Sequence, residues 1–341
     1  MNQHKNQETV PLRIGILGAA RIAPAALILP ARQVTGVEVV SVAARELAKA
    51  QAFAAAHHIP QTHASYAALI ADPTIDAIYN PLPNSLHAEW SICALQAGKH
   101  VLCEKPLANN ASEAQAMAAA AQASGRLLME AFHYRYHPLT LRIKEIVESG
   151  ELGRIRHLEA HFCIPLYRRH DIRWDYALGG GALMDLGCYT VNLLRYLAGA
   201  EPTVIRAQAK VRAPQVDRWM AAELRFPNGI SARMTNSFFS AVLLRVSARV
   251  VGEAGELRVI NFVLPQLWHR LTVQSGQGKR VEHFPGESSY VHQLRAFVAF
   301  VRQGTPCPTD AADGVANMRV IDAIYEKAGL QRRGEQSTKA F

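Results

Sequence analysis

The sequence LRIGILGAARIA, residues 12–23, decides the fold that the rest of the chain is predicted to adopt. Its first half, residues 12–17, is a short apolar run typical of a buried strand, and a turn of small residues follows at once. In this turn Gly18, Ala20 and Ala23 stand where the dinucleotide-binding pattern G-x-G-x-x-G has glycines. Small residues there let the backbone approach a pyrophosphate. Because two of the three glycines are replaced by alanine, a purely structural turn explains this stretch equally well on its own.

Strand-like and helix-like segments alternate from this turn to about residue 131. The expected strands are short apolar runs at residues 12–17, 37–43, 77–79, 101–103 and 127–131. The segments between them are rich in alanine and have helical character, at residues 47–57, 66–71, 88–97 and 108–124. This alternation predicts an α/β fold, with a doubly wound parallel Rossmann sheet over residues 1–131.

The pattern changes after residue 131. Alternating, strand-like segments separated by turn signals lie at residues 154–163, 203–213, 219–226, 230–239, 245–252 and 255–260. Helices are expected at residues 138–149, 290–303 and 310–329. The pattern predicts a second α/β domain over residues 132–330, built on an antiparallel sheet. A polar tail, residues 331–341, is expected to fray.

Length and composition fit a protein with two hydrophobic cores, since the chain has 341 residues of which 49% are apolar. No apolar run reaches membrane-spanning length, and the polar N-terminus lacks the core of a signal peptide, so we expect a cytoplasmic protein. The cysteines are scattered without C-x-x-C spacing: Cys93, Cys103, Cys163, Cys188 and Cys307. They are interpreted as small buried residues in a reducing compartment.

The formal net charge of +9 could suggest a nucleic-acid partner. The basic residues are dispersed, however, and no helix-turn-helix, RNA-binding or zinc-finger signature accompanies them. We therefore expect neither a nucleic-acid nor a membrane partner, but a solvated surface that attracts small molecules bearing phosphate.

The residues after the second predicted strand indicate which dinucleotide binds. NAD sites usually place an acidic residue there to hold the ribose 2′-hydroxyl. This chain has Ala43-Ala44-Arg45, with Lys49 one helical turn beyond. Two cations on one helical face suit the 2′-phosphate of NADP, provided that Glu46 points outward. NADP is favoured over NAD, the alternative being an ordinary exposed Arg and Lys.

Two loops at strand ends carry candidate binding residues. Glu104-Lys105-Pro106 follows a buried strand, at the edge where ligands bind in open α/β sheets. A solvated surface ion pair is the plainer alternative, but the nucleotide-binding pattern upstream makes Lys105 the first candidate for chemistry. NPLPNSLH, residues 80–87, follows the preceding strand and is stiffened by two prolines near the expected nicotinamide.

A third candidate segment is GGGALMDLGCY, residues 179–189. Its glycines open a helix, on which Asp185 and Tyr189 lie four residues apart and so share one face.

In their order and context, these segments and MEAFHYRYHP (residues 129–138) resemble the Gfo/Idh/MocA oxidoreductases. The resemblance covers residues 12–328 and is strongest to the branch of NADP-dependent D-xylose dehydrogenases and dimeric dihydrodiol dehydrogenases. It implies a Rossmann domain followed by an α/β domain with a large, open, mainly antiparallel sheet, usually a subunit interface. It also implies hydride transfer between a nicotinamide and a hydroxyl-bearing carbon of a sugar or polyol.

The resemblance further implies roles for individual residues. Lys105 would contact the nicotinamide ribose and the reacting oxygen, Tyr189 would be the catalytic acid/base, and Asp185 would bind the substrate or tune the tyrosine. The cofactor would be bound by Gly18, Ala20, Arg21, Ile22, Arg45, Lys49, Pro81, Leu82, Asn84, His87, Glu104 and Lys105.

The chemistry of these side chains agrees with such roles. Hydride transfer from an alcohol needs a proton acceptor at the same place, and a neutral tyrosine is a poor base. We expect the ammonium of Lys105 to lower the pKa of Tyr189, whereas Asp185 raises it unless Lys105 neutralises the carboxylate. Asp185 is therefore assigned to orientation and substrate binding. The alternative for Tyr189 is a helix residue with its hydroxyl at the surface.

Other residues are weaker candidates. His133, Tyr134 and His137 follow the last Rossmann strand and could face the cleft, as could Arg173 and Trp174 before the glycine run. No metal site is expected, because His157 and His161, which would share one face of a strand, have no carboxylate motif beside them.

The leading hypothesis is an NADP-dependent oxidoreductase acting on a sugar, of the aldose 1-dehydrogenase or sugar ketone reductase type. A trans-dihydrodiol dehydrogenase is one alternative, and a non-catalytic sensor or regulator that binds NADPH is another. The presence of Lys105, Asp185 and Tyr189 together argues against the sensor. Because an open sheet needs a cover, we expect a homodimer or homotetramer.

Overall fold

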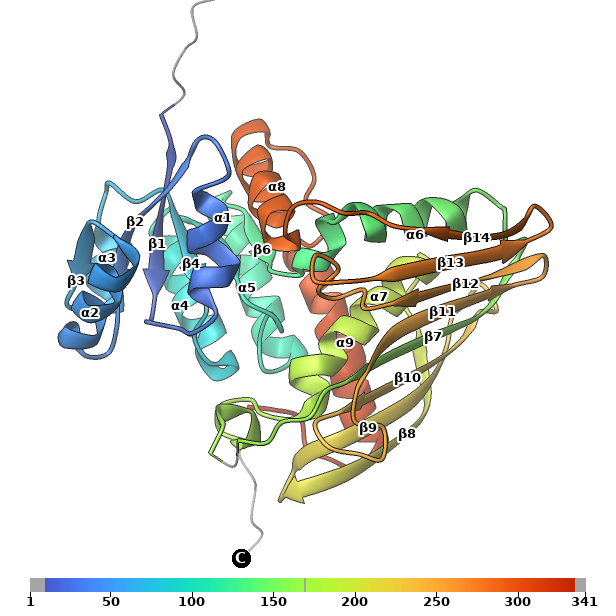
Figure 1. Cartoon of the computed structure of the whole chain (residues 1–341). Coiled ribbons are helices and arrows are strands. Elements are labelled where there is room, and N and C mark those ends of the chain that lie inside the picture. Colours follow the sequence, from blue (N-terminus) through green and yellow to red (C-terminus); the bar gives the residue numbers. More distant parts are fainter. Residues whose placement is uncertain (1–9, 169, 335–341) are drawn as a thin grey trace, which may run out of the picture.

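The N-terminal part of the chain forms a parallel sheet, as seen in a computed structural model that describes residues 10–168 and 170–334 (Figure 1). Its strand order is β3-β2-β1-β4-β5-β6. The strands are β1 (Leu12–Leu17), β2 (Val37–Ala43), β3 (Gln61–His63), β4 (Ala77–Asn80), β5 (His100–Cys103) and β6 (Leu128–Glu130). The predicted doubly wound sheet is confirmed. Strand β3 was not predicted, because three polar residues at a sheet edge carry no apolar pattern.

Helices cover both faces of this sheet. The helices of the first domain are η1 (Pro24–Ile28), α1 (Leu29–Ala31), α2 (Leu47–His57), α3 (Tyr66–Ala71), η2 (Asn84–Leu86), α4 (His87–Gln96) and α5 (Ala111–Ser124). One apolar cluster joins β1 and β4 to α1 and, unexpectedly, to α8 (Ser289–Gln303) from the far end of the sequence. Val291, Leu294 and Phe297 of α8 are fully buried there, so α8 packs on the first sheet although the sequence assigned it to the second domain.

The second sheet has eight strands in the order β14-β13-β12-β11-β7-β10-β9-β8, and it is antiparallel except for the β7–β10 pair. The strands are β7 (Ile155–Cys163), β8 (Thr203–Ala213), β9 (Val216–Arg225), β10 (Ser231–Ser237), β11 (Arg245–Gly252), β12 (Gly255–Ile260), β13 (Arg270–Ser275) and β14 (Gly278–Glu282). The hairpin β13–β14 was not predicted, because both of its strands are short and contain many polar residues.

One face of the second sheet is covered by helices and the other is open (Figure 1). The remaining helical elements are η3 (His133–Tyr136), α6 (Pro138–Glu148), η4 (Ile172–Trp174), η5 (Leu183–Gly187), α7 (Cys188–Ala198) and α9 (Ala311–Lys327). On β7, Leu158 and Ala160 are buried toward the helices. Their neighbour Glu159 lies on the opposite face, where Arg249 and Arg233 stand beside it on adjacent strands.

The segment after α9 is ordered rather than frayed where the structure describes it. Arg333 is completely buried, and its Nη2 lies 2.9 Å from the carboxylate of Asp217 in β9. The prediction of a frayed tail from residue 331 is therefore wrong for residues 331–334, because a buried ion pair holds them. Residues 335–341 lie outside the described residues. Among the described helices, none is long and apolar enough to cross a membrane.

Candidate active site

A cavity of about 290 Å³ lies where the carboxyl ends of β4 and β5 meet η5 and α7 of the second domain. It is lined by nine of the predicted site residues: Ile22, Pro81, Leu82, Asn84, His87, Glu104, Lys105, Asp185 and Tyr189. The remaining predicted residues, Gly18, Ala20, Arg21, Arg45 and Lys49, do not line this cavity and follow β1 and β2. Because β2, β1 and β4 follow one another in the sheet and are all parallel, both groups lie at one edge of the sheet, where dinucleotides bind in such folds.

The centre of the cavity is a network of three charged side chains. Lys105 Nζ donates to Oδ1 of Asp185 at 2.9 Å and to its backbone carbonyl at 3.0 Å. Arg173 Nε donates to Oδ2 of the same carboxylate at 2.7 Å. Burial alone would raise the pKa of Asp185, but Lys105 and Arg173 hold it below its usual value. Burial would likewise lower the pKa of Lys105, but Asp185 raises it, so the lysine stays charged.

Tyr189 lies beside this network and is almost completely buried, so the alternative of a surface hydroxyl is excluded. Lys105 Nζ lies 5.1 Å from the centre of its ring. The expected lowering of its pKa is not observed: burial raises the pKa of Tyr189 well above 10. The physical reason is that Asp185 already neutralises the ammonium group, which leaves little field to favour a phenolate. The Tyr189 hydroxyl is instead within hydrogen-bond distance of His133 Nε2, at 3.2 Å.

His87 lies between the two loops at the strand ends. Its Nε2 lies 2.8 Å from the carbonyl oxygen of Leu82 and its Nδ1 lies 2.9 Å from that of Pro106. Burial lowers the pKa of His87 to about 4, so the ring is neutral and only one of its nitrogens donates. His87 therefore donates a hydrogen bond to one of these loops and packs against the other.

Asn84 and Glu104 line the cavity, and each is fixed by a hydrogen bond. Asn84 Nδ2 donates to the carbonyl oxygen of Gly179 at 3.0 Å, which links the first domain to the glycine run. A Cβ atom at Gly179 would lie 2.3 Å from Asn109 Oδ1, so this close approach requires glycine. The Tyr79 hydroxyl donates to Glu104 at 2.7 Å, although burial raises the pKa of this carboxyl group.

The turn after β1 fits a dinucleotide backbone. Gly18 has a φ of 89°, and its N–H donates to the carbonyl oxygen of Ala43 at 2.6 Å. A Cβ atom there would lie 3.0 Å from Leu82, so glycine alone suits this turn, whereas alanine is accommodated at position 20. Arg21 reaches toward Asp171 of the second domain, at 3.9 Å.

Two basic side chains, Arg45 and Lys49, follow β2, and of the two only Lys49 forms an ion pair within the described part of the chain. Lys49 Nζ donates to Glu46 at 2.6 Å, so both side chains of this pair are engaged with each other. The two predicted cations therefore differ: Lys49 is paired with Glu46, whereas Arg45 has no ion-pair partner among the described residues. Within residues 39–71 Glu46 is the only acidic residue, and it is paired with Lys49. The N–H groups of Arg45 and Lys49 are donors that fit the 2′-phosphate of NADP.

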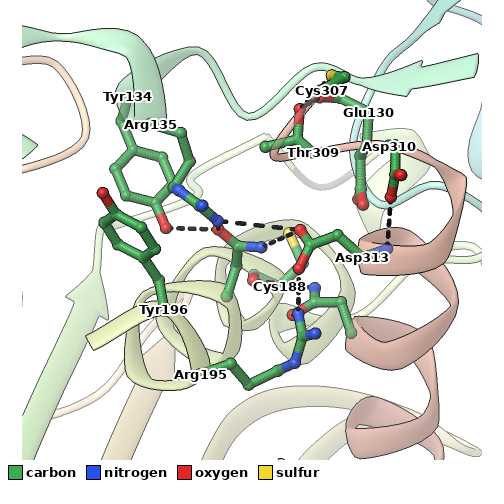
Figure 2. A network of polar contacts seen from close by, with 12 residues as sticks. Glu130, Tyr134, Arg135, Cys188, Arg195, Tyr196, Cys307, Thr309, Asp310 and Asp313 are labelled. Carbon is green, nitrogen blue, oxygen red and sulfur yellow. Dashed lines mark hydrogen bonds and ion pairs between the residues drawn. The ribbon is translucent and has the colours of Figure 1, made fainter. Parts of the chain in front are cut away.

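A largely buried polar network fixes α7 to α9 (Figure 2). The carboxylate of Asp313 accepts from Arg195 Nη1 and from Asn192 Nδ2, each at 3.0 Å. Tyr134 donates to Asn192 Oδ1 at 2.7 Å. The helix that carries Tyr189 is thereby tied to α9.

Of the weaker candidates, His133 and Arg173 line the cavity, whereas Tyr134, His137 and Trp174 do not. Sequence reasoning missed Tyr290 of α8, whose ring lies 4.1 Å from that of His133. No local pattern could have revealed it, because α8 reaches the cavity only through packing on the first sheet. Among the described residues, no group of histidine, cysteine or acidic side chains could hold a metal ion.

Two family models match the chain in succession. The NAD-binding Rossmann domain of the oxidoreductase family matches residues 12–132, and the GFO/IDH/MocA C-terminal domain matches residues 140–258. The chain belongs to the Gfo/Idh/MocA family of oxidoreductases.

Individual relatives agree with this membership. The chain is 38% identical to D-xylose 1-dehydrogenase (NADP(+)) 2 of Haloferax volcanii, over 93% of this chain and 97% of that protein. It is 34% identical to trans-1,2-dihydrobenzene-1,2-diol dehydrogenase of Xenopus laevis, over 66% of this chain and 68% of that protein. Among solved structures, a 3-ketoreductase from Actinomadura kijaniata in complex with NADP and TDP-benzene superposes with a TM-score of 0.85 at 28% identity, covering 93% of this chain and 98% of that one.

Proposed function

We propose that this protein is an NADP-dependent oxidoreductase that transfers hydride between the nicotinamide and a hydroxyl-bearing carbon of a sugar. The observation that carries the proposal is the meeting of Lys105, Asp185 and Tyr189 in one cavity, at the sheet edge where a dinucleotide binds. The similarity to an NADP-dependent xylose dehydrogenase supports the choice of substrate class.

The bound nicotinamide would accept or deliver the hydride, and the side chains of the cavity would handle the accompanying proton. Lys105 uses two of its three N–H groups on Asp185, so one remains to donate to the reacting oxygen or to a ribose hydroxyl. The Tyr189 hydroxyl would exchange the proton with that oxygen. Asp185 keeps the lysine charged and would accept from a neighbouring hydroxyl of the substrate.

The cofactor would lie along the sheet edge from β2 to β5. Gly18, Ala20, Arg21 and Ile22 would face its pyrophosphate, and Arg45 its 2′-phosphate. Lys49 would contribute less, since it is paired with Glu46. Pro81, Leu82, Asn84 and Glu104 would surround the nicotinamide end, and His87 would brace their loop.

We further propose a cytoplasmic homodimer or homotetramer that associates through the open sheet. A cavity of about 910 Å³ on that face is lined by exposed apolar side chains of which Leu244, Leu267 and Trp268 are examples. Such a surface favours burial against a second copy. The five free cysteines suit a reducing compartment.

The test is a steady-state assay of NADP⁺ and NAD⁺ reduction with a panel of aldoses, cyclitols and trans-diols, run on the wild type and on Tyr189→Phe. Turnover of an aldose with NADP⁺, lost in Tyr189→Phe, would support the proposal. Faster turnover of trans-diols would favour the dihydrodiol dehydrogenase. Binding of NADPH without turnover of any compound would favour a sensor.

A further inference from the structure

The hydroxyl group of Tyr189 forms a hydrogen bond with His133 of η3. The mechanism above assigns no role to His133. The oxygen lies 3.2 Å from His133 Nε2, and the two side chains are 5% and 2% exposed. Both line the cavity, so the hydrogen bond stands at the border of the space that a substrate would occupy. The direction of this bond decides what the phenol oxygen can offer to a substrate.

That direction follows from the groups on the far side of His133. Gln266 Oε1 lies 3.4 Å from the backbone N–H of Ser289 and 3.0 Å from its hydroxyl. A backbone N–H can only donate, so the Gln266 atom facing it is the carbonyl oxygen, and the Ser289 hydroxyl also donates to it. Ser289 Oγ has then used its only hydrogen. It must accept from His133 Nδ1, which lies 2.8 Å away.

The charge state of His133 completes the assignment. Burial lowers its pKa to about 3, and the charges of Lys105 and His137 act in the same direction. The other titratable groups against the ring, Tyr189 and Tyr290, are phenols whose pKa values burial raises, so they are neutral. A neutral imidazole with its hydrogen on Nδ1 has a bare Nε2. That atom accepts the hydrogen of Tyr189.

We propose that His133, held in one tautomer by Ser289, is a positioning residue that directs the hydroxyl hydrogen of Tyr189 toward its own Nε2. The phenol oxygen then presents lone pairs to the cavity and accepts a hydrogen bond from the hydroxyl group of an alcohol substrate. When hydride leaves the alcohol carbon for the nicotinamide, the alcohol proton passes to the phenol oxygen and the original hydrogen of Tyr189 passes to His133 Nε2. This inference rests on the proposed function, in which Tyr189 is the acid/base. The inference adds His133 and Ser289 as the residues that set the orientation of the Tyr189 hydroxyl hydrogen.

The first test compares two substitutions of His133 in the oxidation of the alcohol substrate. His133→Gln keeps a carbonyl oxygen able to accept from Tyr189, whereas His133→Leu removes every acceptor. We expect kcat to fall by about tenfold or more in His133→Leu and to be largely retained in His133→Gln, with KM for NADP⁺ within about twofold of the wild type in both. Equal kcat values in the two variants, or a change confined to KM, would overturn the proposal.

The second test addresses the tautomer. In protein labelled with ¹⁵N-histidine, the NMR signal of His133 can be assigned among the 14 histidines as the one missing from His133→Gln. We expect a protonated Nδ1 and a bare Nε2 in the wild type, and a mixture of tautomers in Ser289→Ala. Ser289→Ala should lower kcat in the wild-type background and leave it unchanged in the His133→Gln background, because only histidine has a tautomer to fix. A hydrogen on Nε2 in the wild type, or equal effects in both backgrounds, would refute the assignment.

Failure of this inference can be told apart from failure of the proposed function. If Tyr189→Phe retains full turnover, the acid/base role of Tyr189 is wrong. If Tyr189→Phe is inactive while His133→Leu is as active as the wild type, only the positioning role is wrong. Circular dichroism and thermal unfolding of each variant identify any that fail to fold, and Ser289→Ala tests the same hydrogen bonds without changing the His133 ring.

Discussion

Lys105 Nζ lies 2.9 Å from Asp185 Oδ1, and this ion pair joins the end of β5 in the first domain to η5 in the second. Arg173 shares the same carboxylate, so a single anion holds two cations at the border of the cavity. Removing the anion alone would leave two neighbouring positive charges, one of them largely buried. The arrangement therefore serves the stability of the domain contact as well as the placement of Lys105.

The first prediction concerns this shared anion. Asp185→Asn should lower the free energy of unfolding by roughly 3–5 kcal/mol, because it leaves Lys105 without its counter-charge in a buried place. The double variant Asp185→Asn/Lys105→Met should be less destabilised than Asp185→Asn alone, since it removes the orphaned charge as well. Urea unfolding near neutral pH measures these two variants and the single variant Lys105→Met. Strictly additive effects of the two single substitutions would contradict the structural account.

The second prediction concerns the choice of dinucleotide. Arg45→Ala should raise KM for NADP⁺ by about tenfold while leaving KM for NAD⁺ nearly unchanged, because a charge-assisted contact to a phosphate is worth roughly 1.5–3 kcal/mol. Lys49→Ala is the matched control: its ammonium is already paired with Glu46, so its effect should be smaller. Equal losses with both cofactors, or a larger effect at Lys49, would show that Arg45 does not contact the 2′-phosphate.

Much of this architecture could be predicted because its signals are local. Each Rossmann strand except β3 is an apolar run, and Lys105, Asp185 and Tyr189 stand in motifs that mark strand ends or a glycine-opened helix. The contacts that complete the site are not local. His133 and Ser289 are 156 residues apart and meet only because α8 packs on the first sheet.

The pKa of Tyr189 could not be predicted for a related reason. Sequence places Lys105 near the tyrosine, but the balance between burial and charge depends on which carboxylate the ammonium contacts. Arg333 is a similar case, because a polar terminal segment is interpreted as exposed unless its buried partner, Asp217, is known.

The third prediction uses a buried carboxyl group beneath the loop of Lys105. Glu130 Oε1 accepts from the N–H of Leu107 at 2.9 Å, while Oε2 is buried and has no hydrogen-bond partner among the described residues. Burial and the charge of Asp313 raise the pKa of Glu130 to about 8. Between its unfolded value of 4.5 and about 8, the folded protein therefore holds a proton that the unfolded chain has released.

This difference in proton binding makes the fold less stable as pH rises through that window. Glu130→Gln removes this titration and should flatten the dependence of the free energy of unfolding on pH. The stability of the variant relative to that of the wild type should therefore increase between about pH 5 and pH 9. Urea unfolding of both proteins across the range tests this, with the exposed Glu89→Gln as control for a lost surface carboxylate. Parallel curves for wild type and Glu130→Gln would show that Glu130 is ionised in the fold.

The fourth prediction concerns Arg333, which supports the glycine run from behind. Its Nε donates to the carbonyl oxygen of Gly180 at 2.6 Å, and Nη2 donates to Asp217 Oδ1 at 2.9 Å. Asp217 Oδ2 in turn accepts from the N–H of Leu183, the first residue of η5. The ion pair thus fixes both the glycine run and the start of the helix that leads to Tyr189.

Arg333→Met should destabilise the fold by roughly 3–5 kcal/mol, since it leaves a fully buried carboxylate unpaired. Burial already raises the pKa of Asp217 and Arg333 opposes this, so the loss of the arginine raises that pKa further. A carboxyl group with a raised pKa stabilises the fold below its unfolded value and loses that contribution as pH increases, so the deficit should be smaller in acid than at neutral pH. Asp217→Asn added to Arg333→Met should recover part of the lost stability, because the amide carries no charge to leave unpaired. If the double variant is less stable than Arg333→Met at neutral pH, the carboxylate contributes through its hydrogen bonds to Leu183 and Tyr325 rather than through its charge.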